Sequence, residues 1–377
     1  MIYFDNAATT FPKPERVLKS VQSGILHFGG NPGRSGHKMS MIAAEKIFSI
    51  RQNYADFFGA DVENVIFTSN CTHALNLAIK GVMTSGHAIT SILEHNSVLR
   101  PLNELKRKNI ISYDIANVFE LDEDVTLREF ESRIRPNTKA IICTHASNVT
   151  GTILPIKKLG ELCKKRGLIF IVDAAQTAGV LPINMRELNI NLLCLSGHKS
   201  LMGVTGTGMM VLNGIDKMET IIEGGTGSTS VDLIQPDFCP DRFESGTANT
   251  VGIMSLGAGL DFIKRQGSDK LYRHELMLCE RFIGKLRAKE NIVIYTENIS
   301  YQKKVPVVCF NIKGATSTEI VDFLSNRGFA LRGGLHCAPL THDFLGTKEI
   351  GAVRFSPGVF NKTWEVDKLV QTIKGFE

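Results

Sequence analysis

Lys199 stands in the stretch LSGHKSLMG, among glycines and a histidine and directly after the apolar run 192–195. A short apolar run of this kind predicts a buried strand, so the lysine is expected where that strand ends. A lysine in such a place either extends its amine to water along an apolar stem or reacts through a lowered pKa. The other groups that the fold brings to the same place decide between the two.

Four other apolar runs are also followed at once by polar side chains. In chain order, these followers are TSNCTHALN after 65–67, Glu94 and His95 after 88–93, ASNVTG after 139–145, and DAAQ after 171–172. The carboxyl ends of parallel strands meet at one edge of a sheet, where ligands bind. The five strand ends therefore predict one site with a hydroxyl-bearing helix start, an imidazole, an amide, a carboxylate and the lysine.

Each of these groups has an ordinary structural explanation when it is taken alone. An aspartate at a strand end usually caps a helix, and a lysine near glycines is usually exposed. Their convergence is harder to explain in this way. An amine at Lys199, a carboxylate at Asp173 for a pyridinium nitrogen and a helix start for a phosphate are what pyridoxal phosphate requires.

The order of the predicted elements supports an α/β fold. Short apolar runs alternate with helical patterns up to about residue 250. One such pattern is PIKKLGELCKKR at 155–166, with a proline in its first turn and a glycine after its end. Alternation of this kind predicts a mostly parallel central sheet flanked by helices.

From about Val251 the pattern changes, which predicts a second, smaller α+β domain. Helices are expected at 252–264, 269–289, 316–326 and 364–374, and strands at 305–312 and 352–355. We therefore expect a large domain over 15–255. The smaller domain would consist of 1–14 and 256–377 and would carry Arg354 and Cys337.

Composition is that of an ordinary globular protein and argues against several other classes. Of the 377 residues, 43% are apolar and 21% charged, and the net charge of +5 is spread without a long basic run, which argues against a nucleic-acid surface. No apolar stretch approaches the ~18 residues of a membrane span, and MIYFDNAATT lacks the basic start of a signal peptide. The eight cysteines show no CxxC and no metal-ligand spacing, so we expect a cytoplasmic protein without a metal site.

The chain resembles the class V aminotransferase-like, fold-type I pyridoxal-phosphate enzymes, and among them the cysteine desulfurases and selenocysteine lyases. The resemblance covers essentially the whole chain. It rests on an ordered set of motifs: YFDNAATT, NPGRSGH, EHNSVLRP, ASNVTG, VDAAQ, SGHKSLMGVTGTG, RFESGTANT and RGGLHCAPL. It implies the fold-type I transferase fold with pyridoxal 5'-phosphate as cofactor.

The resemblance also implies a role for each polar strand end. Lys199 would form the Schiff base with the cofactor, and Asp173 would pair with the pyridinium nitrogen. Gln176 would reach the phenolic oxygen, and His95 would stack on the ring. The remaining residues implied for the cofactor are Cys71 through its backbone N–H, Thr72, Asn148, Ser196, His198, and Thr247, which would reach across a homodimer to the partner's phosphate.

Two residues of the smaller domain bear on the reaction. Arg354 lies mid-strand in GAVRFS, where its guanidinium either grips an amino-acid carboxylate in two hydrogen bonds or forms a structural ion pair with a buried partner. Cys337 follows two glycines and a histidine in RGGLHCAPL, and Arg332 and His336 could favour its thiolate form. The residues alone leave open whether Cys337 reacts or is a bystander.

The resemblance favours a cysteine desulfurase, because RGGLHCAPL matches the segment that carries the persulfide-forming cysteine in that family. In the implied reaction, L-cysteine binds through Arg354, with Asn148 and Arg34 as further substrate contacts, and Lys199 abstracts the α-proton. Cys337 then attacks the substrate sulfur. The products are L-alanine and a Cys337 persulfide for a protein acceptor that the sequence does not identify.

Other functions stay open at this point. A selenocysteine lyase or another class V aminotransferase would use the same lysine, aspartate and arginine without needing Cys337. A cofactor-binding scaffold without turnover is a further alternative. No GxGxxG or GxxxxGK[ST] follows a predicted strand to support a nucleotide-binding protein. The chain also departs from its relatives at Leu335, where they often carry a histidine, and at Cys71 and His73.

Overall fold

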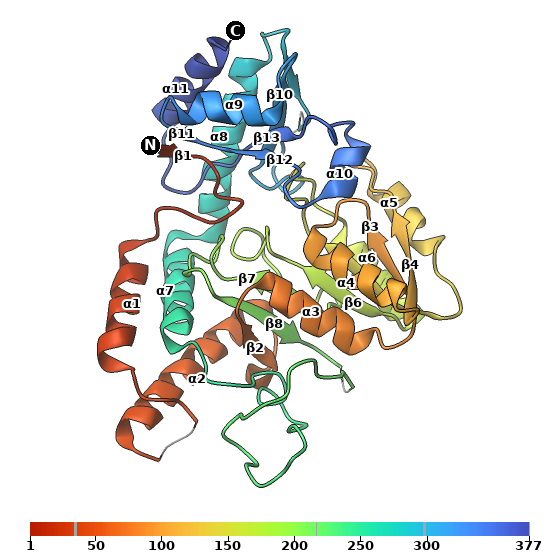
Figure 1. Cartoon of the computed structure of the whole chain (residues 1–377), viewed down its shortest axis with the longest axis vertical. Coiled ribbons are helices and arrows are strands. Elements are labelled where there is room, and N and C mark those ends of the chain that lie inside the picture. Colours follow the sequence, from red (N-terminus) through yellow and green to blue (C-terminus); the bar gives the residue numbers. More distant parts are fainter. Residues whose placement is uncertain (34–35, 216, 297–298, 377) are drawn as a thin grey trace.

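The computed structural model describes residues 1–33, 36–215, 217–296 and 299–376. The chain forms a large part around a central sheet and a smaller part that holds both termini (Figure 1). Within the described residues, no helix is long and apolar enough to cross a membrane.

The central sheet has seven strands among the described residues, in the order β2-β8-β7-β6-β5-β3-β4. Their bounds are β2 Val65–Thr68, β3 Gly86–Ser91, β4 Ile111–Ala116, β5 Thr138–Thr144, β6 Ile169–Asp173, β7 Leu192–Ser196 and β8 Gly208–Leu212. Strands β3 to β7 pair in parallel, and β8 runs antiparallel to both β7 and β2. The carboxyl ends of six of the seven strands therefore meet at one edge of the sheet.

Both faces of the sheet are buried, which explains the continuous apolar runs in the sequence. In β7, Leu193 and Leu195 belong to one apolar core, whereas Leu192 and Cys194 belong to the other, because successive side chains of a strand point to opposite faces. The first core is completed by α2 Lys38–Phe58, α5 Glu123–Glu131, α6 Ile156–Arg166 and α7 Thr250–Gln266. The second is completed by α3 Cys71–Val82 and α4 Asn96–Arg107, while α1 Glu15–His27 packs against α7.

The smaller part is built on an antiparallel sheet in the order β12-β13-β10-β9. Its strands are β9 Ile292–Ile294, β10 Val308–Ile312, β12 Arg332–Gly334 and β13 Ala352–Phe355, and β1 Ile2–Tyr3 pairs with β11 Phe329–Ala330 beside it. Its helices are α8 Ser268–Leu286, α9 Ser317–Ser325, α10 Pro339–Phe344 and α11 Thr363–Lys374, and a short 3-10 helix, η1 Val62–Asn64, precedes β2 in the large part. A separate apolar core, which includes Phe4, Phe282 and Phe355, holds this part together.

The expected α/β class with a mostly parallel sheet is confirmed. The sequence analysis did not predict β4, because this edge strand, ISYDIA, is only partly buried and carries polar residues. The strand expected at 305–312 begins only at Val308. The division into two domains near residue 255 stays a prediction; α7 crosses that boundary and packs into the core of the large part as far as Ile263.

Candidate active site

A cavity of about 200 Å³ lies where the carboxyl ends of the central strands meet the smaller part. The strand ends contribute most of its wall, and Ala7, Ala8, Arg332, His336 and Arg354 close it from the other side. The expected site residues that line this one cavity are Cys71, Thr72, His95, Asn148, Asp173, Gln176, Ser196, His198, Lys199 and Arg354.

Two expected residues within the described part of the chain are not among those that line this cavity. Cys337 lines an adjoining groove, and Thr247 lines a separate cavity together with Phe67 and Glu244. Arg34 lies outside the described residues.

Lys199 follows the end of β7 and lies in the polar wall of the cavity. Burial lowers the pKa of its amine from the ordinary value, and the negative charge of Asp173 opposes this shift. A lowered amine pKa increases the fraction of neutral, nucleophilic amine at neutral pH. The lowered pKa agrees with the second of the two expectations for this lysine, and its reactivity stays a prediction.

Asp173 is the last residue of β6, and its buried carboxylate faces the same cavity. Its Oδ1 accepts hydrogen bonds from the Cys71 thiol at 3.3 Å and from the Ala175 backbone N–H at 2.9 Å. Burial raises the pKa of the Cys71 thiol well above its ordinary value, which keeps it protonated as a donor. Both contacts use Oδ1, and no hydrogen bond joins Oδ2 to another described residue, so Oδ2 is available to a ligand. The expected contribution of Cys71 was its backbone N–H, and the structure adds a bond from its sulfur.

His95 is the N-cap residue of α4, and the hydrogen bonds of this cap hold its ring in place. Its Nδ1 accepts from the Ser97 backbone N–H at 3.0 Å and lies 2.8 Å from the Ser97 hydroxyl. Burial lowers the pKa of its imidazole to about 4, so the ring is neutral at neutral pH. The Thr72 hydroxyl lies 2.7 Å from the same Ser97 hydroxyl, which links the start of α3 to the start of α4.

One side of the cavity is suited to an anion. Cys71 and Thr72 open α3, whose first backbone N–H groups point away from the helix, and Asn70 caps it. Ser196 and His198, which are close to Lys199 in the sequence, also line the cavity. The His198 Nδ1 is buried and has no hydrogen-bond partner within the described part of the chain. An unpartnered buried nitrogen is costly unless a ligand satisfies it.

Arg354 lies mid-strand in β13 with 1% of its surface exposed. Its Nη2 donates to Asp5 Oδ1 at 2.8 Å, and its Nη1 donates to the Asn148 carbonyl at 3.1 Å. Asp5, whose side chain is only partly buried, is thus the partner that the ion-pair interpretation requires, and it was not predicted from the sequence. The signal for it is the motif YFDNAATT. Arg354 nevertheless lines the cavity, and its Nε lacks a partner among the described residues.

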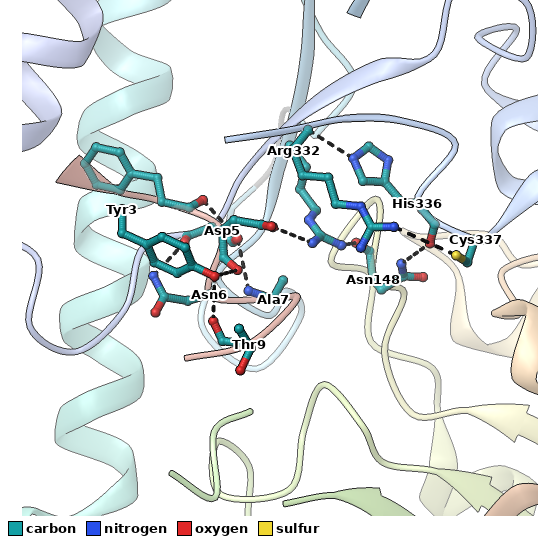
Figure 2. Close-up of polar contacts among 12 residues, drawn as sticks. Tyr3, Asp5, Asn6, Ala7, Thr9, Asn148, Arg332, His336 and Cys337 are labelled. Carbon is teal, nitrogen blue, oxygen red and sulfur yellow. Dashed lines mark hydrogen bonds and ion pairs between the residues drawn. The ribbon is translucent and has the colours of Figure 1, made fainter. Parts of the chain in front are cut away.

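Gln176 and Asn148 tie neighbouring segments to the cavity wall. The Gln176 amide donates to the Ala7 carbonyl at 3.1 Å, which holds the N-terminal segment against the end of β6. The Asn148 amide donates to the His336 carbonyl at 2.8 Å (Figure 2). Both amides therefore connect the large part to the smaller part.

Cys337 is exposed at the edge of the site. Its Sγ lies 3.8 Å from Arg332 Nη2, as Figure 2 shows, and its carbonyl accepts from the Asn96 backbone N–H at 2.7 Å. The groove that it lines shares Thr72, His95 and Ser97 with the cavity. His336 does not face the thiol, because its ring bonds to the Arg332 carbonyl and to His342. Of the two groups expected to favour the thiolate, the structure places only Arg332 beside it.

The arrangement fits pyridoxal phosphate on several independent grounds. An amine with a lowered pKa, a carboxylate whose Oδ2 accepts no hydrogen bond from the described residues, an imidazole nitrogen without a partner among those residues, and a helix start surround one cavity. These are the donors and acceptors that the aldehyde, the ring nitrogen and the phosphate of that cofactor require.

Comparison with known proteins agrees with this geometry. The family model described as aminotransferase class-V matches residues 2–369. A probable cysteine desulfurase of Pyrococcus abyssi is 31% identical over 99% of this chain and 94% of the relative, and one of Halalkalibacterium halodurans is 29% identical over 100% and 92%.

Solved structures show the same likeness over the whole chain. The apo structure of a cysteine desulfurase from Thermococcus onnurineus NA1 is 32% identical, with a TM-score of 0.91, and the match covers 100% of this chain and 95% of that one. The cysteine desulfurase CsdA of Escherichia coli shares the fold at 23% identity, with a TM-score of 0.86 over 99% and 93% of the two chains.

Proposed function

Because this chain belongs to the class-V aminotransferase family, we propose that it is a pyridoxal-phosphate-dependent cysteine desulfurase. It converts L-cysteine to L-alanine and keeps the sulfur as a persulfide on Cys337. The observation that carries the proposal is the position of Cys337 beside Arg332, at the edge of a cavity that brings Lys199 and Asp173 together. An aminotransferase would need the lysine and the aspartate but not the thiol.

Pyridoxal phosphate, bound through Lys199, Asp173 and the start of α3, would supply an electron sink for a negative charge at the substrate α-carbon. The chain's own residues provide the rest. The Lys199 amine, whose pKa burial lowers, is the base that takes the proton from the α-carbon. The neutral His95 ring forms a side of the cavity without adding a charge that would compete for the carboxylate of Asp173.

Arg354 is the proposed site for the substrate carboxylate. Its guanidinium already bonds to Asp5 and to the Asn148 carbonyl, and its unpartnered Nε remains for a further acceptor. A guanidinium presents five N–H donors, so one acceptor can be added without breaking the contacts that hold the side chain. Asn148 then lies beside the same substrate group.

The sulfur step belongs to Cys337. Its thiolate attacks the sulfur of the bound cysteine, an S–S bond forms, and the bond between that sulfur and the substrate β-carbon breaks. The electron pair of the broken bond stays with the substrate, which takes up a proton and leaves as alanine. Arg332, 3.8 Å from Sγ, places a positive charge beside the attacking sulfur. A thiol acceptor then removes the outer sulfur.

A homodimer is part of the proposal. Large apolar side chains are exposed on α1, on α2 and in the segment after β8: Leu18, Ile25, Leu26, Met39, Met41, Phe48, Val231, Leu233 and Ile234. A monomer rarely exposes so many together. Thr247 lines a cavity apart from Lys199 in its own chain, so a phosphate contact by Thr247 requires the site of a second copy. Light scattering after gel filtration tests the dimer, and a monomer at micromolar concentration would contradict it.

The cytosol is the proposed compartment. All eight cysteines are free, and burial raises the pKa of thiols such as Cys143 and Cys194, which keeps them unreactive. A chain with eight thiols and an exposed reactive one suits a reducing environment.

The first experiment measures alanine and sulfide released from L-cysteine, with a thiol reductant present, for the native chain and for Cys337→Ala. Cys239→Ala, which removes a half-buried thiol away from the cavity, is the matched control. We expect both products from the native chain and the control, and neither from Cys337→Ala, which still changes its visible spectrum when cysteine binds. Full activity of Cys337→Ala would make that thiol a bystander. L-Selenocysteine in parallel tests the lyase alternative, which predicts turnover of selenocysteine without Cys337.

A further inference from the structure

The backbone at the proposed nucleophile is unusual. His336 and Cys337 are consecutive residues with positive φ, 49° and 57°, the left-handed region that side chains other than glycine rarely adopt. Such conformations are strained and persist only where the surroundings impose them. The contacts that impose them here determine where the Cys337 thiol lies.

Two hydrogen bonds from the large part and one within the turn hold this turn in place. The Asn148 amide donates to the His336 carbonyl, and the Asn96 backbone N–H donates to the Cys337 carbonyl. The Ala338 N–H closes the turn on the Leu335 carbonyl at 2.9 Å. The bonds from Asn148 and Asn96 fix the carbonyls of His336 and Cys337. The His336 side chain holds the turn from the smaller part.

The His336 ring is bonded at both nitrogens. Nε2 lies 3.2 Å from the Arg332 carbonyl, and Nδ1 lies 3.1 Å from His342 Nε2. His342 Nδ1 in turn lies 2.8 Å from the Thr347 hydroxyl. The rings of His336 and His342 lie in planes only 21° apart, with 5.3 Å between their centres, and both residues are buried.

The carbonyl at one end fixes every proton in this series. A carbonyl only accepts, so His336 Nε2 must carry the proton. In a neutral ring its Nδ1 then accepts, which requires a proton on His342 Nε2. His342 Nδ1 is left as an acceptor, and the Thr347 hydroxyl donates to it. Thr347, His342 and His336 therefore form a hydrogen-bonded series with one direction.

Both rings are neutral at neutral pH, as this direction requires. Burial lowers the pKa of His336 to about 2, with Arg354 on β13 and Arg332 on β12 as further positive neighbours, and burial lowers the pKa of His342 to about 4. Neither histidine is needed to bind the cofactor or to transfer a proton in the reaction proposed above. A pair of buried imidazoles without such a task needs another explanation.

We propose that His342 is a positioning residue for the sulfur-accepting cysteine: through its bond to His336 it holds the left-handed turn that places Cys337 beside Arg332. Thr347 orients His342, and His342 fixes the tautomer of His336. The His336 ring then anchors the turn to the Arg332 carbonyl, four residues before it. The inference rests on the proposed function only in that Cys337 accepts sulfur. The contacts that hold the turn do not depend on the substrate.

Two substitutions of His342 distinguish the contributions of its two ring nitrogens. His342→Gln keeps an N–H near the place of Nε2 and so keeps the bond to His336. His342→Asn keeps an acceptor near the place of Nδ1, toward Thr347, and loses the bond to His336. Both remove the imidazole, so a general loss of packing affects the two variants alike.

Two readouts are measured on the full-length protein with its cofactor. Hydrogen exchange of a peptide over 333–340 reports the order of the turn, and alanine formation from L-cysteine gives kcat and KM. We expect His342→Asn to exchange faster over 333–340 and to lose about tenfold or more in kcat with KM nearly unchanged, since misplacing a reacting group costs up to about 10²-fold. We expect His342→Gln to stay within about threefold of the native chain in both.

Equal losses in the two variants, or a parallel rise in KM and drop in melting temperature without faster local exchange, would overturn the inference in favour of a merely structural pair. If the native chain forms no alanine, the proposed function fails, and the difference in exchange between the two variants still decides the inference. Thr347→Val, compared with Thr347→Ser, should shift exchange in the same direction as His342→Asn but less, because only the outer bond is lost. No difference between the Thr347 variants and the native chain would remove Thr347 from the series.

Discussion

The Arg354 guanidinium lies 2.8 Å from the Asp5 carboxylate, which joins the middle of β13 to a segment 349 residues earlier in the chain. Arg354 lines the cavity that also holds Lys199, and Asp5 contacts the guanidinium. Burial lowers the pKa of Arg354, and Asp5 opposes that shift, so the aspartate helps keep a positive charge in a place that disfavours it. Under the proposed function, the site for the substrate carboxylate is thus prepared before the substrate binds.

Arg354→Lys is expected to raise KM for L-cysteine by about tenfold or more, with a smaller change in kcat. A lysine amine cannot donate to Asp5, to the Asn148 carbonyl and to a substrate carboxylate in the fixed planar pattern of a guanidinium. Steady-state kinetics measure the effect. Arg281→Lys, at a surface pair with Asp367, is the control and should leave both constants unchanged. An unchanged KM in Arg354→Lys would assign Arg354 to the ion pair alone.

Cys71→Ala is expected to weaken cofactor binding severalfold, whereas Cys71→Ser should retain most of it. The alanine removes the donor to Asp173 Oδ1, and a hydroxyl restores a donor of nearly the same size. Absorbance titration of the apoprotein with pyridoxal phosphate measures the affinity without reference to turnover. Equal affinity in both variants would show that the Ala175 N–H suffices to orient the carboxylate.

Lys304→Met is expected to destabilise the protein by about 2–4 kcal/mol. The Lys304 side chain is fully buried, pairs with Glu120 at 2.6 Å, and donates to the Thr150 carbonyl and the Thr152 hydroxyl. Methionine fills similar space but removes the ion pair with Glu120 and the donor to the Thr150 carbonyl. Urea unfolding measures the change, and Lys303→Met, at an exposed neighbouring position, should cost less than about 1 kcal/mol. Equal midpoints for the two variants would contradict the prediction.

Stability is expected to fall as the pH drops from about 6.5 to about 4. Five histidines have folded-state pKa values lowered to about 4 or below, mainly by burial: His95, His145, His198, His336 and His342. Between the folded and unfolded pKa values the unfolded chain binds more protons, so lowering the pH favours unfolding. Glu94 and Glu275, whose pKa burial raises to about 8, act in the opposite direction between about 4.5 and 8 but are fewer.

Urea midpoints at pH 7 and pH 5 measure this dependence. His145 is the sharpest single test, since its ring is buried and its Nδ1 has no partner among the described residues. His145→Gln should reduce the difference between the two midpoints, because glutamine does not titrate. A midpoint that rises toward pH 5 in the native chain would show that the buried carboxyl groups outweigh the histidines.

The sequence by itself determined the strand ends and the residues that follow them. Strands buried on both faces appear as continuous apolar runs, and parallel strands bring their carboxyl ends to one edge, so local pattern was enough to place Lys199, Asp173 and His95 together. The family motifs added the roles of these residues. Strand β4 was not predicted from the sequence, because a partly buried edge strand needs no apolar run.

Only the tertiary structure decided which way the loop side chains point and which distant groups meet. Asp5 as the partner of Arg354, the Cys71 sulfur on Asp173, and His336 turned away from the Cys337 thiol toward His342 all follow from packing between separate segments. A residue type limits what a side chain can bond to, but the partner is chosen by long-range contacts that local pattern does not contain. For this reason the reactive groups could be named from the sequence, while the contacts that hold and tune them required the fold.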